Sequence, residues 1–329
     1  MPVKCNERHV RVTQTTTHPS NTRHRLRDWL PNTVNHTVRI LAWLSLAMQI
    51  TLIGTGGAVR LTASGLGCPT WPLCSSSSLI PTPALGIHGI IEFGNRMLTG
   101  VLVLVVVAML LSVLRSRKLR RDIFVLALVQ FALVAVQAVV GGITVKTGLG
   151  PYVVGSHYLL SIVLVILTTN LVYRVYNGRR GSERLTPRWY VALSILTAVV
   201  VGITVIFGVL TSGAGPHAGD NSNAKALAPR NGLDPALLQY IHSIPAYTTF
   251  GLTVLLVIIA VAARERTRWR CVRVFSLGLL GVEFVQIIVG YVQAKEGLPV
   301  ALVNIHLVLA AILVAAIAAL LLSLRGSGR

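Results

Sequence analysis

The sequence predicts an all-α integral membrane protein, with eight transmembrane helices arranged as two repeated four-helix bundles. Three observations indicate this fold class: an apolar composition, eight apolar segments of spanning length, and a repeat relating the two halves of the chain. Of the 329 residues, 53% are hydrophobic and 12% are charged, and the mean hydropathy is +0.70. This composition excludes a water-soluble globular domain.

Eight apolar segments each approach the ~20 residues that a helix needs to cross a bilayer. We expect helices at about 39–60, 86–114, 123–145, 152–173, 189–211, 236–262, 274–293 and 300–323. The residues before the first segment are polar and basic and contain no apolar signal sequence. Residues 1–38 are therefore expected to form a disordered cytoplasmic tail.

The net charge of +20 comes from short basic clusters between the apolar segments. Clusters placed in this way indicate membrane topology, and we expect no nucleic-acid partner. Of the 30 Lys and Arg residues, 24 fall in the N-terminal tail, in the three loops that follow even-numbered segments, and at the C-terminus. The positive-inside rule then predicts a multi-pass cell-membrane protein with both termini in the cytoplasm.

An internal repeat divides the spans into two units of the same orientation. Residues of the third and fourth segments recur at an offset of 149, and the matched pairs are Gln137/Gln286, Gly141/Gly290, Gly148/Gly297, Leu149/Leu298 and His157/His306. We expect one four-helix unit at 39–173 and another at 189–323. A basic cytoplasmic linker at 174–188 would join them, and 324–329 would be a short cytoplasmic tail.

Two histidines of the second unit, His242 and His306, each lie near the outer end of an otherwise apolar helix. Two neutral imidazoles that face each other across a four-helix bundle are suitable axial ligands for a six-coordinate haem iron. Each histidine could instead bond a backbone carbonyl in a packed core. The matched depth of the two residues favours haem.

The first unit differs from this pattern at two positions. Its His157 has a counterpart in the second unit, but Asn95 occupies the position of His242 at an offset of 147. Glu92 likewise occupies the position of the neutral Gln239. The first unit therefore offers one imidazole, a weak amide ligand and a carboxylate, which predicts a metal site that substrate can reach.

Glu92 lies on one helical face with His88, Asn95 and Arg96. An ionisable side chain inside a span costs about 2.5–3.5 kcal/mol, so such residues usually have a function. Glu92 could stabilise a developing positive charge or move a proton. The alternative is that Glu92 pairs with Arg96 and only holds helices together.

Cys68 and Cys74 lie in the first outer loop, where a disulfide is expected on the oxidising side of the membrane. The bond could be a structural staple or a redox-active pair. Glu283, in the seventh segment, has no evident partner in the sequence, and we expect a role in helix packing or in a solvated pocket.

Several of these motifs together resemble haem A synthase of the actinobacterial kind. They are TGGAVRLTASGLGCPTWPLC, IIEFGNRMLTG, QAVVGGITVKTGL, the GPHAGD loop and NIHLVLAA. The resemblance covers nearly all of residues 39–323. It implies an oxidoreductase of eight helices in two bundles, which oxidises a ring methyl group of haem O to a formyl group through successive hydroxylations and so forms haem A.

The resemblance also implies roles for particular residues. A haem b cofactor would be held by His242 and His306, and a substrate haem would bind near His157 with Glu92 as the catalytic carboxylate. The family cysteine pair falls on Cys68 and Cys74, which would form a disulfide.

One departure from the family pattern concerns the second segment. Many members read E-x-x-H-R where this chain reads Glu92-Phe-Gly-Asn95-Arg96, so the haem ligand from this helix is missing. His88 shares the face but lies about 10 Å further along the axis, too far to take its place without a shift of the haem. We further expect Arg60 or Arg96 to pair with a haem propionate.

The partners implied are haem O, a haem O synthase, an electron donor such as a quinol or a ferredoxin-like protein, and the lipid bilayer; a homo-oligomer is left open. Two other functions are weighed against this one. A di-haem b-type electron-transfer cytochrome would not modify haem, and it would gain nothing from an acidic, open site. A transporter would place its polar groups at the bilayer midplane, whereas here they lie near the outer surface.

Overall fold

The fold was analysed in a computed structural model that describes residues 34–217, 228–265 and 267–328. The predicted tail lies largely outside the described residues. The helices are α1 (His36–Leu61), α2 (Gly86–Leu114), α3 (Arg121–Lys146), α4 (Pro151–Asn177), α5 (Arg188–Ala214), α6 (Pro235–Ala262), α7 (Arg270–Lys295) and α8 (Val300–Ser323). A 3-10 turn, η2 (Pro83–Leu85), precedes α2, and β1 (Arg179–Arg184) pairs antiparallel with β2 (Arg325–Gly328).

In the described part of the chain, eight helices are long and apolar enough to cross a membrane, which confirms the predicted fold class and spans. The helices are slightly longer than the apolar segments. For example, α1 begins before residue 39 because the side chain of Asn35 accepts a 3.0 Å hydrogen bond from the Val38 amide and caps the helix. Polar residues at the membrane boundary thus continue helices that an apolar pattern alone would end.

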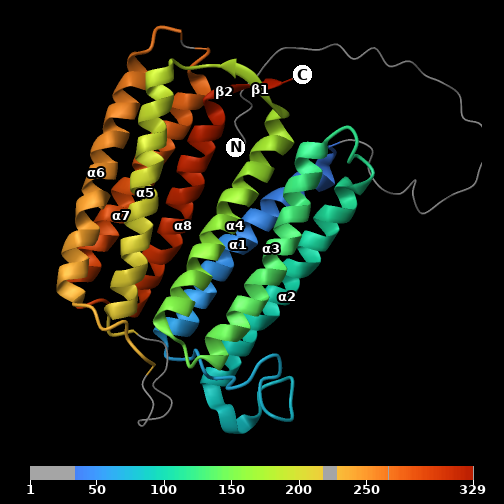
Figure 1. The fold of residues 1–329 in the computed structure, drawn as a ribbon, viewed down its shortest axis with the longest axis vertical. Coiled ribbons are helices and arrows are strands. Elements are labelled where there is room, and N and C mark those ends of the chain that lie inside the picture. The colour runs from blue at the N-terminus through green and yellow to red at the C-terminus, as the bar shows by residue number, and fades with distance from the viewer. Residues whose placement is uncertain (1–33, 218–227, 266, 329) are drawn as a thin grey trace, which may run out of the picture.

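The helices form two side-by-side groups of four (Figure 1). In the first group α1 packs on α2 and α4, and α3 packs on α2 and α4. In the second, α6 packs on α5 and α7, and α7 packs on α8. The groups meet where α8 contacts α1 and α4, and where α4 contacts α5.

The repeat extends to the backbone of the outer turns. Gly148 and Leu149 follow α3 with φ of 59° and 61°, and Gly297 and Leu298 follow α7 with φ of 72° and 62°. In both turns the leucine amide donates a 2.8 Å hydrogen bond to a carbonyl five residues earlier, which is the Schellman pattern of a helix C-terminus. The same left-handed pair therefore ends the third helix of each unit.

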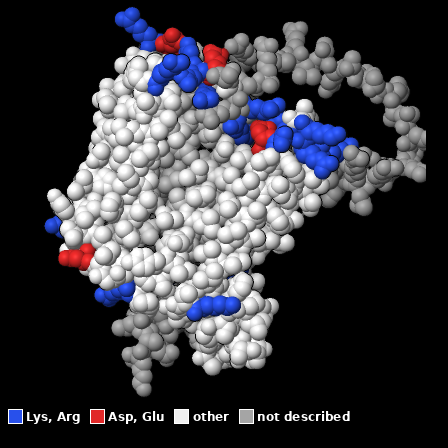
Figure 2. All heavy atoms as spheres, in the orientation of Figure 1, with Lys and Arg blue, Asp and Glu red and all other residues white. Residues whose placement is uncertain are grey.

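Charged side chains gather at the two ends of the molecule, and a broad uncharged band separates them (Figure 2). Many large apolar side chains in this band are exposed, among them Leu104, Ile258 and Phe284. Such a band is what lipid chains contact in a membrane protein. Most of the basic side chains in view lie at the end that carries β1 and β2, which we call the basic end.

Candidate functional site

The two histidines of the second unit face each other. His242 from α6 and His306 from α8 have ring centroids 6.4 Å apart, with the ring planes at 73°. A metal ion bound to both rings by bonds of about 2 Å would fit between two imidazoles at such a spacing. The structure therefore brings together the pair that the repeat singled out.

A main-chain carbonyl fixes the orientation of the His242 ring, and a side-chain amide holds the backbone of His306. Nδ1 of His242 lies 3.0 Å from the carbonyl oxygen of Thr204, so this nitrogen carries the proton and Nε2 keeps its lone pair. On α8, the amide nitrogen of Gln286 donates a 3.1 Å hydrogen bond to the carbonyl of His306. Nδ1 of His306 is buried without a hydrogen-bond partner among the described residues.

Each of three histidines rests on a glycine of a neighbouring helix. A Cβ atom added to Gly208 would lie 3.1 Å from Cε1 of His242, and one added to Gly290 would lie 3.0 Å from Cε1 of His306. In the first unit the corresponding distance from Gly141 to His157 is 3.1 Å. The matched glycines of the repeat thus leave room for matched imidazoles.

The first unit repeats this arrangement with an amide in place of one imidazole. The Gln137 amide nitrogen donates to the His157 carbonyl at 2.9 Å, as Gln286 does for the histidine of the second unit. The Thr55 hydroxyl donates a 2.7 Å hydrogen bond to the amide oxygen of Asn95. Thr55 corresponds to Thr204 at the repeat offset of 149, so one position of α1 and α5 supports the second ligand position in both units.

Glu92 is 5% exposed and is held at both carboxylate oxygens. Oε2 accepts a 2.7 Å hydrogen bond from the backbone amide of Cys68, and Oε1 pairs with the Arg96 guanidinium at 2.5 Å. A carboxylate accepts hydrogen bonds at both oxygens, which is the pattern seen here. Glu92 and Arg96 do form the ion pair that the sequence left open as a purely structural alternative. The same carboxylate also binds the outer loop through the Cys68 amide.

The outer loop is closed by a disulfide between Cys68 and Cys74, as the sequence predicts. Arg96 fastens the same loop to α2, because its guanidinium also donates to the carbonyls of Cys68, Thr70 and Leu73 at 3.2, 3.0 and 3.2 Å. The disulfide loop, Arg96 and Glu92 therefore form one connected unit.

Two further predicted residues lie at the edges of this unit. His88 Nδ1 is 2.8 Å from the hydroxyl of Ser64, at the start of the outer loop. Arg60 reaches across to the second bundle, where it donates two 2.8 Å hydrogen bonds to the hydroxyl and carbonyl of Ser212. A propionate at Arg60 or Arg96 would have to displace these protein acceptors, and pairing with a propionate stays a prediction.

The COX15-CtaA family, described as cytochrome oxidase assembly protein, matches residues 39–318. The chain belongs to this family.

Three relatives of the chain are called heme A synthase. The protein of Exiguobacterium sibiricum is 33% identical over 168 residues, which cover 49% of this chain and 55% of the relative. The protein of Bacillus pumilus is 29% identical over 199 residues, covering 59% and 63%. That of Staphylococcus epidermidis is 28% identical over 225 residues, covering 64% and 72%. The chain spans about half the length of the first of these relatives.

The donor set of this COX15-CtaA member fits a haem. Within residues 34–217, 228–265 and 267–328, no three or more His, Cys, Asp or Glu side chains form a group that could hold a metal ion. His242 and His306 supply two ligands only, and a haem brings the remaining ligands in its own ring. The fixed tautomer of His242 and the unpartnered Nδ1 of His306 leave ring nitrogens available for an iron.

The sequence of this COX15-CtaA member did not indicate the backbone groups that contact Glu92 and His242. The Cys68 amide that binds Glu92 and the Thr204 carbonyl that orients His242 are main-chain groups, so no residue type signals them. The glycines beneath the histidines did leave a signal. Gly141 and Gly290 match in the repeat, and their equal spacing to a histidine could have suggested a ring resting on the backbone.

Proposed function

We propose that the protein is a haem A synthase, an oxidoreductase that oxidises a ring methyl group of haem O to a formyl group. The observation that carries this proposal is the difference between two repeated sites. The second unit presents two imidazoles 6.4 Å apart, whereas the first presents one imidazole, an amide and a held carboxylate. An electron relay has no use for the site of the first unit, with its amide and carboxylate, but a reaction at a bound substrate does.

We assign the cofactor, haem b, to the bundle at 189–323, where His242 and His306 would hold its iron. This haem would supply one-electron redox chemistry. The protein's own contribution there is to orient the ring of His242 through the Thr204 carbonyl and to hold the backbone of His306 through Gln286. In the described residues no acidic side chain joins the two histidines in a group that could hold a metal ion, so the proposal gives the iron two imidazole ligands from the protein.

The substrate haem belongs, in this proposal, to the bundle at 39–173. His157 is the imidazole for its iron, and Asn95 leaves the opposite side weakly ligated. Glu92 would stabilise positive charge that develops at the methyl carbon, or would accept the proton that this carbon loses. Arg96 and the Cys68 amide would fix the carboxylate for this role, and His88 lies at the outer edge of the same site.

The remaining assignments follow from the charge distribution and the reaction. Both termini and the basic end would face the cytoplasm of the cell membrane. A haem O synthase would supply the substrate, and a quinol or a ferredoxin-like protein would exchange electrons with the haem of the second unit.

Glu92→Gln tests the proposal in cells that express the protein together with a source of haem O. We expect haem b to be retained and haem A, measured by chromatography and mass spectrometry of extracted haem, to be lost, because the variant keeps the shape but not the charge. Glu283→Gln is the matched control, since it neutralises a buried glutamate of the other bundle, and it should still form haem A. Normal haem A in Glu92→Gln would remove Glu92 from the reaction, and unmodified haem from the unaltered protein would support the electron-transfer cytochrome instead.

A further inference from the structure

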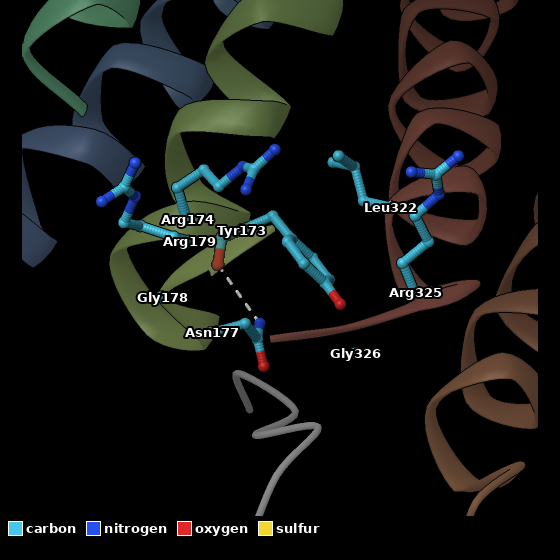
Figure 3. A pocket seen from close by; sticks show the side chains of 8 residues that line it. All are labelled: Tyr173, Arg174, Asn177, Gly178, Arg179, Leu322, Arg325 and Gly326. Atoms are coloured by element: carbon cyan, nitrogen blue, oxygen red, sulfur yellow. Dashed lines mark hydrogen bonds between the residues drawn. The ribbon is translucent and has the colours of Figure 1, made fainter. Parts of the chain in front are cut away.

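A pocket lies at the basic end, where the last turns of the two bundles come together (Figure 3). It is lined by Tyr173, Arg174, Asn177, Gly178, Arg179, Leu322, Arg325 and Gly326. The first five belong to the end of α4 and the start of β1, and the other three to the end of α8 and β2. The pairing of β1 with β2 therefore brings both halves of the chain to one site, far from the histidines.

Cationic side chains surround this pocket. Arg174 and Arg325 lie on opposite sides of it, and the side chains of Tyr173 and Leu322 lie between them (Figure 3). Arg325 is only partly exposed. In the described part of the chain, the guanidiniums of Arg179 and Arg325 make no hydrogen bond or ion pair. A partly buried cation without a partner is costly, which favours an anion from outside the chain.

The nearby carboxylate of Asp122 offsets only part of this charge. It is bound by Arg120, whose Nε and Nη2 each donate a hydrogen bond of 3.1 Å. Arg120 in turn donates a 2.8 Å hydrogen bond to the carbonyl of Arg174, which ties the pair to the pocket wall. The three arginines that line the pocket and Arg120 carry four positive charges against the one negative charge of Asp122, so the net charge of this set is four minus one, or +3.

We propose that this pocket binds the phosphate of an anionic phospholipid headgroup. Guanidiniums bind phosphate oxygens through paired hydrogen bonds, and Arg174 and Arg325 bring one such group from each bundle. Arg174 also donates a 3.2 Å hydrogen bond from Nε to Oδ1 of Asn170. The pocket lies where α4 and α8 end, beside the uncharged band that contacts lipid chains (Figure 2). Basic pockets between helices at the cytoplasmic side suit acidic headgroups.

Lipid explains more of the pocket than free phosphate does. Tyr173 and Leu322 place an aromatic ring and an aliphatic side chain beside the cations, where the glycerol and upper acyl groups of a lipid would pack. A bound headgroup would also bridge Arg174 of the first bundle and Arg325 of the second. The lipid would then join the two bundles at the basic end, independently of any haem chemistry.

The test is lipid binding by the purified full-length protein in mild detergent. Fluorescent phosphatidylglycerol is titrated against the parent protein, Arg174→Gln/Arg325→Gln and Arg325→Gln alone. A hydrogen bond to a charged group contributes about 1.5–3 kcal/mol, so we expect the double variant to bind about ten- to a hundredfold more weakly. The single variant should fall between the two, and it loses no contact within the described chain, so it remains informative if the double variant unfolds.

Two controls give the result its meaning. Arg117→Gln/Lys118→Gln removes the same two charges from exposed residues of the loop between α2 and α3, at the same end of the molecule. It should bind phosphatidylglycerol within about twofold of the parent. Equal weakening in both double variants would overturn the site in favour of diffuse attraction. Displacement of the lipid by inorganic phosphate as readily as by unlabelled phosphatidylglycerol, or equal binding of phosphatidylcholine, would overturn the assignment to an anionic lipid.

Discussion

The contact between a histidine ring and a glycine is the smallest feature that recurs in both units. Gly290 leaves 3.0 Å between an added Cβ and Cε1 of His306, which is closer than packed carbon atoms normally lie. A methyl group there must push the imidazole aside. The ring position that the proposed haem requires therefore depends on a residue without a side chain.

Gly290→Ala should consequently weaken haem binding in the second unit. We expect lower haem content per protein and an altered reduced-minus-oxidised absorbance spectrum, because the ring of His306 moves by a few tenths of an ångström or more. Gly281→Ala is the matched control on the same helix, since an added Cβ meets nothing within 4 Å there. It should keep the spectrum and stabilise α7 by up to about 1 kcal/mol through helix propensity. Equal haem content in the two variants would contradict the contact argument.

At this scale the sequence predicted the residues but not their partners. His242, His306 and Glu92 stand out because polar groups in apolar helices are costly. Their nearest supports are main-chain groups, such as the Thr204 carbonyl and the Cys68 amide, which no residue pattern identifies. Arg60 is a further example. Its position on the first helix suggested a partner in the first bundle, but its guanidinium donates a hydrogen bond to Ser212 of the second bundle.

A polar contact joins α6 and α7 at a place where their repeat counterparts, α2 and α3, have apolar side chains. The Thr253 hydroxyl donates a 2.9 Å hydrogen bond to Oε1 of Glu283, which is 3% exposed, while Oε2 has no partner in the described residues. At the repeat offsets of 147 and 149, the first unit has Val106 and Val134, and both are buried. The same helix pair thus packs with two valines in one unit and with a half-satisfied carboxyl group in the other.

Thr253→Val/Glu283→Val copies the first unit into the second and should raise stability. Leaving a buried polar atom unsatisfied costs about 1–3 kcal/mol, and the double variant removes it together with its partner. The midpoint of thermal unfolding in detergent measures the change, and Glu283→Val alone should gain less because the threonine hydroxyl loses its acceptor. A lower midpoint, or loss of haem at an unchanged midpoint, would instead assign Glu283 a functional role.

The outer loop between α1 and α2 links the Cys68–Cys74 disulfide to Glu92, because the Cys68 amide binds the carboxylate. Cys68→Ser/Cys74→Ser should cost about 2 kcal/mol, the value expected for so short a closed loop. Because the Cys68 amide binds Glu92, the loss should be coupled to Glu92→Gln, and the double-mutant cycle should deviate from additivity by more than about 0.5 kcal/mol. Thermal unfolding of the four proteins gives the coupling. Strict additivity would show that the loop and the carboxylate act independently.

Across the whole molecule, the repeat predicted the two bundles but not how they dock. An alignment of the two halves compares each helix with its own counterpart, so it contains no information on contacts between units. Two seams join them. Along one, Gly57 of α1 lies against the Asn304 side chain of α8; along the other, Gly155 of α4 faces Val209 of α5. A cavity of about 150 Å³ lies beside the second seam, between α4 and α5.

Gly57 is therefore the position at which docking of the bundles can be tested. Gly57→Val would drive a side chain into Asn304, and overpacking of this kind costs about 1–3 kcal/mol. Gly56→Val is the matched control one residue away, where an added Cβ meets nothing within 4 Å. Thermal unfolding should show a lower midpoint for Gly57→Val only. If each bundle holds its own haem site, the spectrum of the second-unit haem should survive in both variants below the midpoint, because α6 and α8, which carry His242 and His306, both belong to the second bundle. Loss of that spectrum in folded Gly57→Val would mean that the seam, and not the bundle alone, sets the distance between the two imidazoles.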